Sequence, residues 1–192
     1  MKLTQYKFLF LDRDGVINIE RKDDYVKSVA EFIFEDRALE AISILSQCFE
    51  EIFVVTNQRG IGRGKMQPED LELVHSYMLG EIIKHGGHVS NIYFCTAIDG
   101  HNINRKPNVG MAFRAQADFQ HIDFRQSVMV GNSKSDIEFG NKLGMYTVLV
   151  GNKYPVGDKI YKEVDYYCDN LYKFALLLKE TGQNEHHTEA NI

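Results

Sequence analysis

Runs of consecutive apolar residues alternate with amphipathic segments along most of the chain. Consecutive apolar residues are typical of parallel strands covered on both faces, and apolar residues spaced three or four apart predict helices with one buried face. We expect strands at residues 8–11, 52–55, 91–95, 128–130, 146–150 and 164–168. We expect helices at residues 37–49, 68–85, 107–118, 137–143 and 171–179. This alternation predicts an α/β fold, a Rossmann-like, doubly wound parallel sheet in three α/β/α layers.

Two helix starts carry specific signals. Asp36 is a favourable N-cap for the first helix. Pro107 suits the first position of the third helix, which would place Lys106 at its entrance. A cation beside the free N–H groups of a helix favours a bound anion, although a solvated Lys-Pro turn is the plainer interpretation.

Residues 16–35 show no helical period, in contrast to the segments around them. We expect an irregular flap or small hairpin over the carboxyl ends of the strands. An ordinary connection is the alternative. The remaining gaps leave no room for a separate cap domain, so the pocket should be open at the top.

Composition narrows the class of protein. With 192 residues, 44% of them hydrophobic, the chain can bury one core. We expect a single domain over residues 1–180 and a flexible C-terminal tail over 181–192. Lys and Arg total 22 against 27 Asp and Glu, a net charge of −5, so no basic surface for nucleic acid is expected.

The cysteines and the amino terminus indicate the cellular compartment in which we expect the protein. Three widely spaced cysteines, an odd number, fit reduced thiols in a cytoplasm better than a disulfide framework. The first apolar stretch is interrupted by Asp12 before it reaches the length of a membrane segment. We expect a cytoplasmic protein with no membrane partner, a monomer or weak homodimer.

Charged and polar residues begin where the first strand ends. Asp12 and Asp14 follow it directly, and Gly15 lets the backbone turn. In open α/β sheets, ligands bind outside the carboxyl ends of the strands, so this pair is a candidate site. An isolated Asp-x-Asp is more often a polar turn, and the other strand ends decide between the two.

The second strand ends in Thr56, Asn57, Gln58 and Arg59, followed by a glycine-rich loop. A hydroxyl, an amide and free backbone N–H groups make a good phosphate cradle. A nucleotide-binding P-loop at residues 62–65 is excluded because the required spacing of glycines and the Ser or Thr are missing.

The later strand ends add a cation and more oxygen donors. Arg105 and Lys106 precede Pro107, and the fourth strand is followed by Asn132, Ser133 and Asp136. The end of the third strand and the loop 96–104 offer only Cys95 and His101 as soft ligands, too few for a closed zinc site, so we expect no zinc.

Together the strand ends supply what phosphoryl transfer to a carboxylate needs: a nucleophile, a cation and groups that bind phosphate. Asp12 is expected to be ionised at neutral pH and can attack without a base. The acyl phosphate that results divides one difficult hydrolysis into two easier steps.

These motifs resemble, in order and spacing, the four motifs of the haloacid dehalogenase superfamily of phosphatases, over about residues 8–150. The resemblance is closer to the subgroup that contains D-glycero-D-manno-heptose 1,7-bisphosphate phosphatase and the histidinol-phosphate phosphatase domain. It rests on residues 12–18, 24–26, 55–64, 105–111 and 131–136.

The resemblance implies a role for each matching residue. Asp12 would be the nucleophile and a Mg²⁺ ligand. Asp14 would be the general acid and base, with a pKa raised by a neighbouring carboxylate, and its carbonyl would bind the metal. Residues implied to bind substrate or phosphate are Thr56, Asn57, Gln58, Arg59, Arg105, Lys106 and Ser133, and the metal set is Asp12, Asp14, Asn132 and Asp136.

Two departures from the family pattern matter. Asn132 stands where relatives have a metal-binding Asp, so one negative charge is missing and we expect weaker Mg²⁺ binding, with Asp136 coordinating in part. The Cys/His zinc loop of many relatives is reduced to Cys95 and His101, which weakens the heptose assignment.

Several functions stay open at this point. We expect a Mg²⁺-dependent phosphatase for a small sugar phosphate, with a histidinol-phosphate-type phosphatase as the alternative. A non-catalytic phosphosugar-binding protein with a weakened metal site is a competitor, and a phospho-acceptor receiver module fits the sheet but not the Thr-Asn loop.

Overall fold

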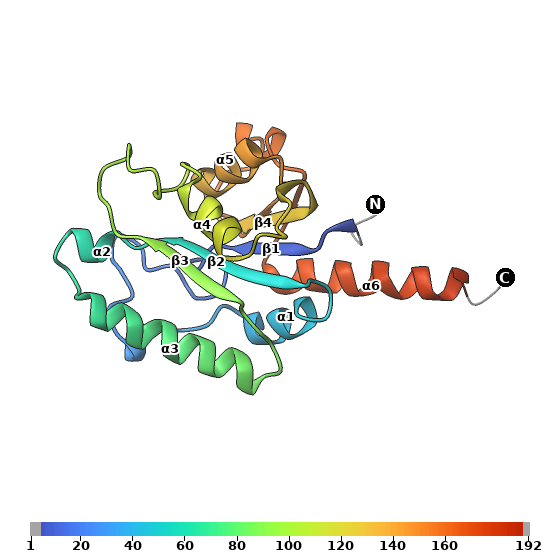
Figure 1. Cartoon of the computed structure of the whole chain (residues 1–192), viewed down its shortest axis with the longest axis horizontal. Helices are drawn as coiled ribbons and strands as arrows, with labels where there is room; N and C mark the ends of the chain where they lie inside the picture. The colour runs from blue at the N-terminus through green and yellow to red at the C-terminus, as the bar shows by residue number, and fades with distance from the viewer. Residues whose placement is uncertain (1–4, 190–192) are drawn as a thin grey trace.

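The computed structural model describes residues 5–189 of the chain, with side chains as far as residue 181. Six parallel strands form one sheet in the order β3-β2-β1-β4-β5-β6 (Figure 1). The strands are β1 (Phe8–Leu11), β2 (Glu51–Asn57), β3 (Asn91–Cys95), β4 (Ser127–Gly131), β5 (Tyr146–Val150) and β6 (Tyr166–Cys168). β1 lies at the centre, between β2 and β4. The predicted doubly wound parallel sheet is confirmed.

Helices cover both faces of the sheet. α1 (Ala38–Leu45), α3 (Pro68–Lys84) and α6 (Leu171–Glu189) pack on one face, and α4 (Gly110–Asp118) and α5 (Lys134–Leu143) on the other (Figure 1). Successive strand residues serve the two cores in turn: Leu9 and Leu11 contact the first, Phe8 and Phe10 the second. All four β1 side chains are buried, as the consecutive apolar run predicted.

The first predicted helix start is wrong. α1 begins at Ala38 with Arg37, not Asp36, at its N-cap, and it ends at Leu45, short of Phe49. Arg37 pairs with Glu40 and lies over the ring of Tyr172 in α6, so a contact between helices sets this start.

The helix expected from Pro107 begins only at Gly110, so Lys106 does not lie at a helix entrance. The backbone N–H and C=O of Lys106 are both bonded to the side chain of Asn57, at 3.0 and 3.1 Å. Since these groups are engaged with β2, they are not available to start a helix. Lys106 is positioned by this tertiary contact, and the helix-dipole argument does not apply to it.

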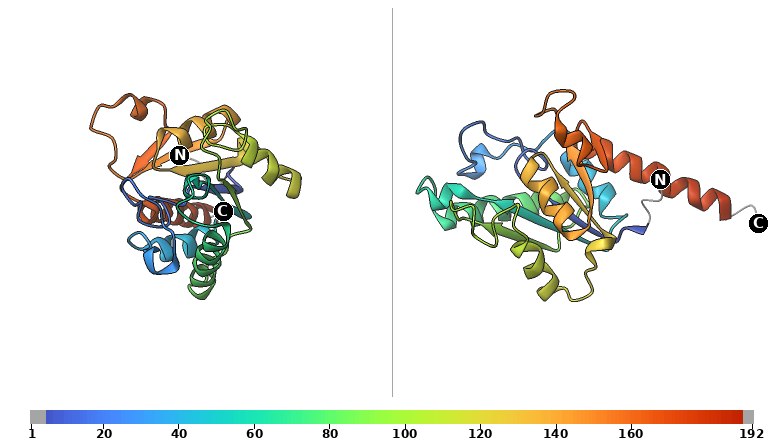
Figure 2. Two further views of the ribbon diagram at one scale, coloured as in Figure 1. Left: turned by 90° about the vertical axis from the view of Figure 1, so that its left-hand side faces the viewer. Right: turned by 90° about the horizontal axis from the view of Figure 1, so that it is seen from above.

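The C-terminal helix is longer than predicted. α6 continues to Glu189 and runs on beyond the sheet (Figure 2), whereas we expected it to end at Lys179. The segment expected as a tail from Thr181 is therefore helical as far as Glu189, and residues 190–192 lie outside the described residues. The division into a domain over 1–180 and a flexible tail stays a prediction.

Residues 16–35 form the expected irregular segment, which we call the flap. Its regular structure is limited to a short 3₁₀ turn (Val29–Glu31) and isolated bridges from Asn18 to Asp14 and Phe34. The flap contributes six residues, 20, 21 and 23–26, to the lining of the main pocket, so it does lie over the site. None of the described helices has the length and apolarity needed to cross a lipid bilayer.

Candidate active site

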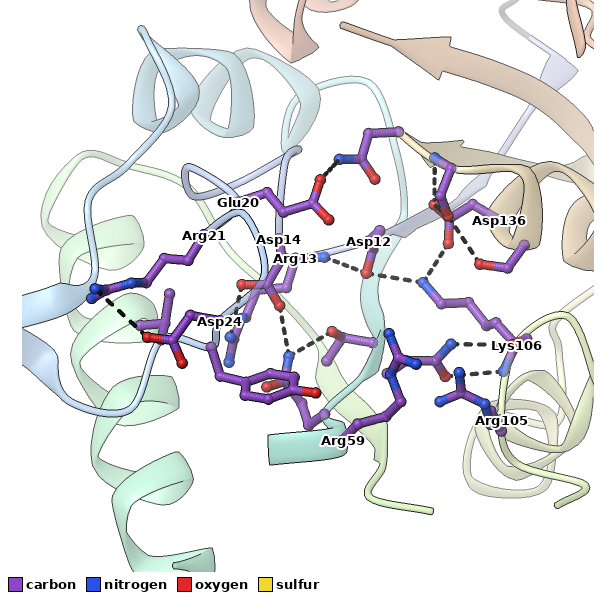
Figure 3. Close-up of a pocket in the computed structure, with 18 of the residues that line it drawn as sticks. Asp12, Arg13, Asp14, Glu20, Arg21, Asp24, Arg59, Arg105, Lys106 and Asp136 are labelled. Atoms are coloured by element: carbon purple, nitrogen blue, oxygen red, sulfur yellow. Dashed lines mark hydrogen bonds and ion pairs between the residues drawn. The ribbon is translucent and has the colours of Figure 1, made fainter. Parts of the chain in front are cut away.

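A polar pocket of about 430 Å³ lies at the carboxyl end of the sheet, beside β1 at the centre of the strand order. This is where ligands bind in doubly wound folds. Every residue that the sequence predicted for the site lines this pocket: Asp12, Asp14, Thr56, Asn57, Gln58, Arg59, Arg105, Lys106, Asn132, Ser133 and Asp136. Figure 3 shows Asp12, Lys106 and Asp136 converging from separate elements.

Lys106 contacts two carboxylates of the pocket, Asp12 and Asp136. Its Nζ lies 2.9 Å from Asp12 Oδ1 and 2.6 Å from Asp136 Oδ1, and it donates to the Val55 carbonyl at 2.6 Å. Lys106 is only 2% exposed. Burial lowers the pKa of its ammonium group, but Asp12 and Asp136 outweigh this and raise it. The site therefore contains a fixed positive charge beside the proposed nucleophile.

Asp12 is a buried carboxylate with an unusual charge balance. Burial and the negative charge of Asp136 raise its pKa to about 7, against the opposing effect of Lys106. Its Oδ1 also accepts from the backbone N–H of Arg13, at 2.8 Å. The expectation of an ionised nucleophile at neutral pH therefore depends on cations at the site.

Asp14 has the opposite environment. Burial raises the pKa of its carboxyl, but Arg13, Asn18 and Gln58 donate to it at 2.9, 3.0 and 2.8 Å and lower the pKa overall. The expectation that a neighbouring carboxylate raises the pKa of Asp14 is wrong, because three donors surround this group, and the third, Gln58, comes from a segment 44 residues away.

Arg13 is a functional neighbour that the sequence did not single out. Its side chain is fully buried, and it holds Asp14 through Nη2 and His75 of α3 through Nη1, at 3.2 Å. Burial, followed by the charge of Arg13, lowers the pKa of His75 to about 3. A neutral His75 can therefore accept a hydrogen bond from Arg13, and this contact positions the guanidinium group.

This buried imidazole predicts a loss of stability in acid. The unfolded chain binds a proton at the ordinary His pKa of 6.5 and the folded chain does not. The contribution of His75 to the free energy of unfolding is complete above pH 6.5. It should fall by on the order of 3 kcal/mol as the pH decreases towards 3. His75→Gln should lack this loss and the exposed-loop control His101→Gln should keep it, measured by chemical unfolding at several pH values. An unchanged acid profile in His75→Gln would contradict the assignment.

Thr56, Asn57 and Gln58, at the end of β2, lie beside Asp14 and Lys106. Thr56 is buried, and its Oγ1 accepts from Gln58 Nε2 at 2.9 Å. Gln58 donates from the same nitrogen to Asp14, and Asn57 binds the backbone of Lys106. Gln58 and Asn57 thus position Asp14 and Lys106 in this structure, and their direct phosphate contacts stay predictions.

Three arginines gather on one side of the pocket. Arg59 and Arg105 lie near each other below Lys106 (Figure 3), and Arg63 lines the same region. Burial, together with the charges of Arg59 and Arg63, lowers the pKa of Arg105. Arg63 also donates to Tyr25 of the flap, at 2.9 Å. A cluster of guanidinium groups of this kind is suited to binding an anion.

Ser133 and Asp136 form the start of α5. The backbone N–H and Oγ of Ser133 donate to Asp136 Oδ2, at 3.0 and 2.6 Å. Gly131 permits this close packing, because a Cβ there would lie 2.2 Å from the Cβ of Asp136. Both carboxylate oxygens of Asp136 are thus engaged, one by Ser133 and one by Lys106. Substrate binding by Ser133 and metal binding by Asp136 stay predictions.

Asn132 lies against the turn that carries Asp14. Gly15 has a φ of +80°, and a Cβ at Gly15 would lie 1.8 Å from Asn132 Nδ2, so only glycine fits there. The same nitrogen donates to Glu20 of the flap at 3.0 Å, and Glu20 pairs with Lys153. Glu20 and Lys153 were not predicted as site residues, because their contact joins segments 133 residues apart.

The oxygen atoms around Asn132 could serve as ligands of a divalent cation. Three oxygen atoms accept no hydrogen bond from the described residues: Asp12 Oδ2, Asn132 Oδ1 and the carbonyl of Asp14. Burial raises the pKa of Asp12, so a nearby positive charge would stabilise its ionised form. Mg²⁺ is typically held by one or two carboxylates plus water and phosphate oxygens. Among the side chains that the structure describes, as far as residue 181, no three His, Cys, Asp or Glu groups are placed to hold a metal, so the candidate ligands are one carboxylate, one amide and one carbonyl oxygen.

Known proteins share this sequence and fold. Residues 103–174 match the family model described as HAD-hydrolase-like. The D-glycero-alpha-D-manno-heptose-1,7-bisphosphate 7-phosphatase of Burkholderia mallei is 39% identical over 150 residues, 74% of this chain and 78% of that protein. The D-glycero-D-manno-heptose-1,7-bisphosphate 7-phosphatase of Chlorobaculum tepidum is 34% identical over 182 residues, 87% of this chain and 91% of that protein.

A solved structure agrees. D,D-heptose 1,7-bisphosphate phosphatase from B. bronchiseptica, complexed with magnesium and phosphate, matches with a TM-score of 0.79 and 29% identity over 91% of this chain and 99% of that chain. This chain belongs to the haloacid dehalogenase (HAD) superfamily of phosphatases. It is a phosphoric monoester hydrolase, and the relatives described above are heptose bisphosphate phosphatases. The family resemblance and the enzyme interpretation are confirmed.

Proposed function

We propose that this enzyme is a Mg²⁺-dependent phosphatase that removes one phosphate from a heptose bisphosphate through an aspartyl-phosphate intermediate. The observation that carries the proposal is the buried Asp12 carboxylate, paired with Lys106 and facing a polar pocket. Relatives at 34–39% identity are named for this substrate class. A phosphorylated substrate also suits a pocket that contains several cationic side chains.

The residues of the pocket divide the chemistry between them. Asp12 would attack phosphorus, with Lys106 and Thr56 beside the transferring group. Asp14 would protonate the leaving oxygen. The negative charge of a phosphate ester brought next to Asp14 opposes the effect of Arg13 and raises the pKa of the carboxyl towards that of a working acid. A bound Mg²⁺, held by Asp12, Asn132 and the Asp14 carbonyl, would polarise the phosphoryl oxygens.

A second phosphate group has a place in the same pocket. Arg59, Arg63 and Arg105 form a cationic region that adds to the charge of Lys106, with the flap residue Tyr25 hydrogen-bonded to Arg63. A bisphosphate whose reacting group lies at Asp12 would place its other phosphate there. This cluster supports a bisphosphate over a monophosphate such as histidinol phosphate, the alternative substrate class.

The cysteines support a reducing compartment. Cys48, Cys95 and Cys168 are all free thiols, and Cys95 is buried in the core below the site. We infer a cytoplasmic enzyme that acts on a small soluble phosphate ester.

A substrate panel tests the proposal. We expect D-glycero-D-manno-heptose 1,7-bisphosphate to be hydrolysed in millimolar Mg²⁺ with a kcat/KM roughly ten-fold or more above those of heptose 7-phosphate and histidinol phosphate, because the monophosphates leave the arginine cluster unpaired. EDTA should remove the activity and added Mg²⁺ restore it. Phosphate release that is equal with and without metal, or fastest with histidinol phosphate, contradicts the assignment.

A further inference from the structure

We propose that Glu20 of the flap supplies the negative charge that Asn132 lacks at the divalent-metal end of the site, by holding the Asn132 amide with its oxygen free for the ion. This inference rests on the proposed metal dependence. It adds Glu20, a positioning residue, to the site.

The geometry sets the orientation of the amide. Asn132 is 7% exposed, and its Nδ2 donates to Glu20 Oε2 at 3.0 Å. Turning the amide over would bring its oxygen against the carboxylate of Glu20, which is repulsive. The nitrogen therefore faces Glu20, and Oδ1 is left as an acceptor to which no described residue donates. The amide also packs on Gly15, directly after Asp14, so it lies at the end of the pocket where a cation fits.

Asp136, the carboxylate four residues after Asn132, already has partners for both of its oxygens. Asp136 accepts from Ser133 with one oxygen and pairs with Lys106 through the other. Glu20, labelled in Figure 3, accepts a hydrogen bond from Asn132, the side chain that replaces the usual Asp, so its charge lies next to the position where the missing charge would be.

Lys153 competes for Glu20 only weakly. Its Nζ lies 2.9 Å from Glu20 Oε2, but both side chains are 44% exposed. Pairs as exposed as this are screened by water and contribute little. A divalent cation carries twice the charge of Lys153, so Lys153 is not expected to cancel the effect of this carboxylate.

Metal binding without turnover tests the inference. Mn²⁺, a stand-in for Mg²⁺, is titrated into metal-free protein and binding is followed by the loss of the free-ion EPR signal. We expect Glu20→Gln to raise the Kd for Mn²⁺ by roughly ten-fold, the size of effect that removing an outer partner of a metal ligand has. Glu31→Gln is the matched control: it removes the same charge from the flap, where Glu31 pairs with Arg21 and Lys27, without a contact to Asn132. It should bind as the wild type does.

Moving the charge provides the decisive comparison. The double variant Glu20→Gln/Asn132→Asp carries one carboxylate at position 132 in place of the one at 20, and it should bind Mn²⁺ within about three-fold of the wild type. Affinity that is unchanged in Glu20→Gln, or lost equally in Glu31→Gln, or not restored in the double variant, overturns the inference and leaves the proposed function standing. A wild-type protein that binds no Mn²⁺ at millimolar concentration overturns both.

Discussion

Replacing Asp12 by Asn is expected to lower turnover by roughly 10⁴-fold or more while the fold is kept, because the amide cannot form the covalent intermediate. The structure explains why folding should survive. Lys106 keeps its contacts to Asp136 and the Val55 carbonyl when Asp12 loses its charge. The variant also removes a carboxylate whose burial is unfavourable, as the raised pKa of Asp12 indicates. Steady-state kinetics and thermal unfolding measure the two effects.

A trapping experiment separates the nucleophile from a residue that only supports it. After rapid acid quenching with a ³²P-labelled substrate, wild-type protein should carry label and Asp12→Asn should carry none. Asp24→Asn is the control, since Asp24 lines the same pocket from the flap and its side chain is 42% exposed. It should lose less than about ten-fold in turnover, as expected for a group outside the reacting atoms. Asp12→Asn activity within ten-fold of the wild type would refute the nucleophile assignment.

Lys106→Met is expected to have the largest effect on stability, a loss of roughly 3–5 kcal/mol in the free energy of unfolding, because it leaves buried charges without a partner. Asp12 and Asp136 are 9% and 0% exposed, and each pairs with Lys106. Met preserves most of the aliphatic volume of the side chain, so the loss reports on charge and not on a cavity. Turnover should also fall by roughly 10²–10³-fold or more through lost charge stabilisation. Chemical unfolding in EDTA and steady-state kinetics measure the two effects.

Two further variants check that explanation. Lys134→Met removes a lysine whose side chain is 61% exposed and pairs with Glu138, and it should cost less than about 1 kcal/mol. Lys106→Met/Asp136→Asn should be more stable than Lys106→Met alone, because one of the two unpaired carboxylates is gone. Equal stability of these two Lys106 variants would show that the charges around Lys106 do not dominate the loss.

Local patterns were sufficient for most of the fold. The apolar run at residues 8–11 became the central strand, and the periodic segment after Pro68 became α3. The helix starts at Asp36 and Pro107 were wrong for a common reason. In both places a tertiary contact, Arg37 with Tyr172 and Asn57 with Lys106, overrides the local capping preference.

The residue types of the site were also readable, because each follows an apolar strand at its carboxyl end. The pKa shifts of these residues could not be predicted from the sequence. Asp12 and Asp14 are two residues apart, yet the pKa of Asp12 is raised and that of Asp14 lowered. Asp136 faces the first, and Arg13 and Gln58 surround the second. Such differences depend on which groups the fold brings within a few ångströms.

The sequence by itself determined the parallel α/β sheet and the set of oxygen and cationic groups at its edge, because apolar runs and strand ends are local features. Only the tertiary structure decided how those groups pair. Glu20 and Asn132 are 112 residues apart and meet because the flap reaches the residue that follows β4, while His75 of α3 is hydrogen-bonded to Arg13. Hydrogen bonds between distant segments depend on strand register, burial and the path of the flap, and no spacing within one segment encodes these.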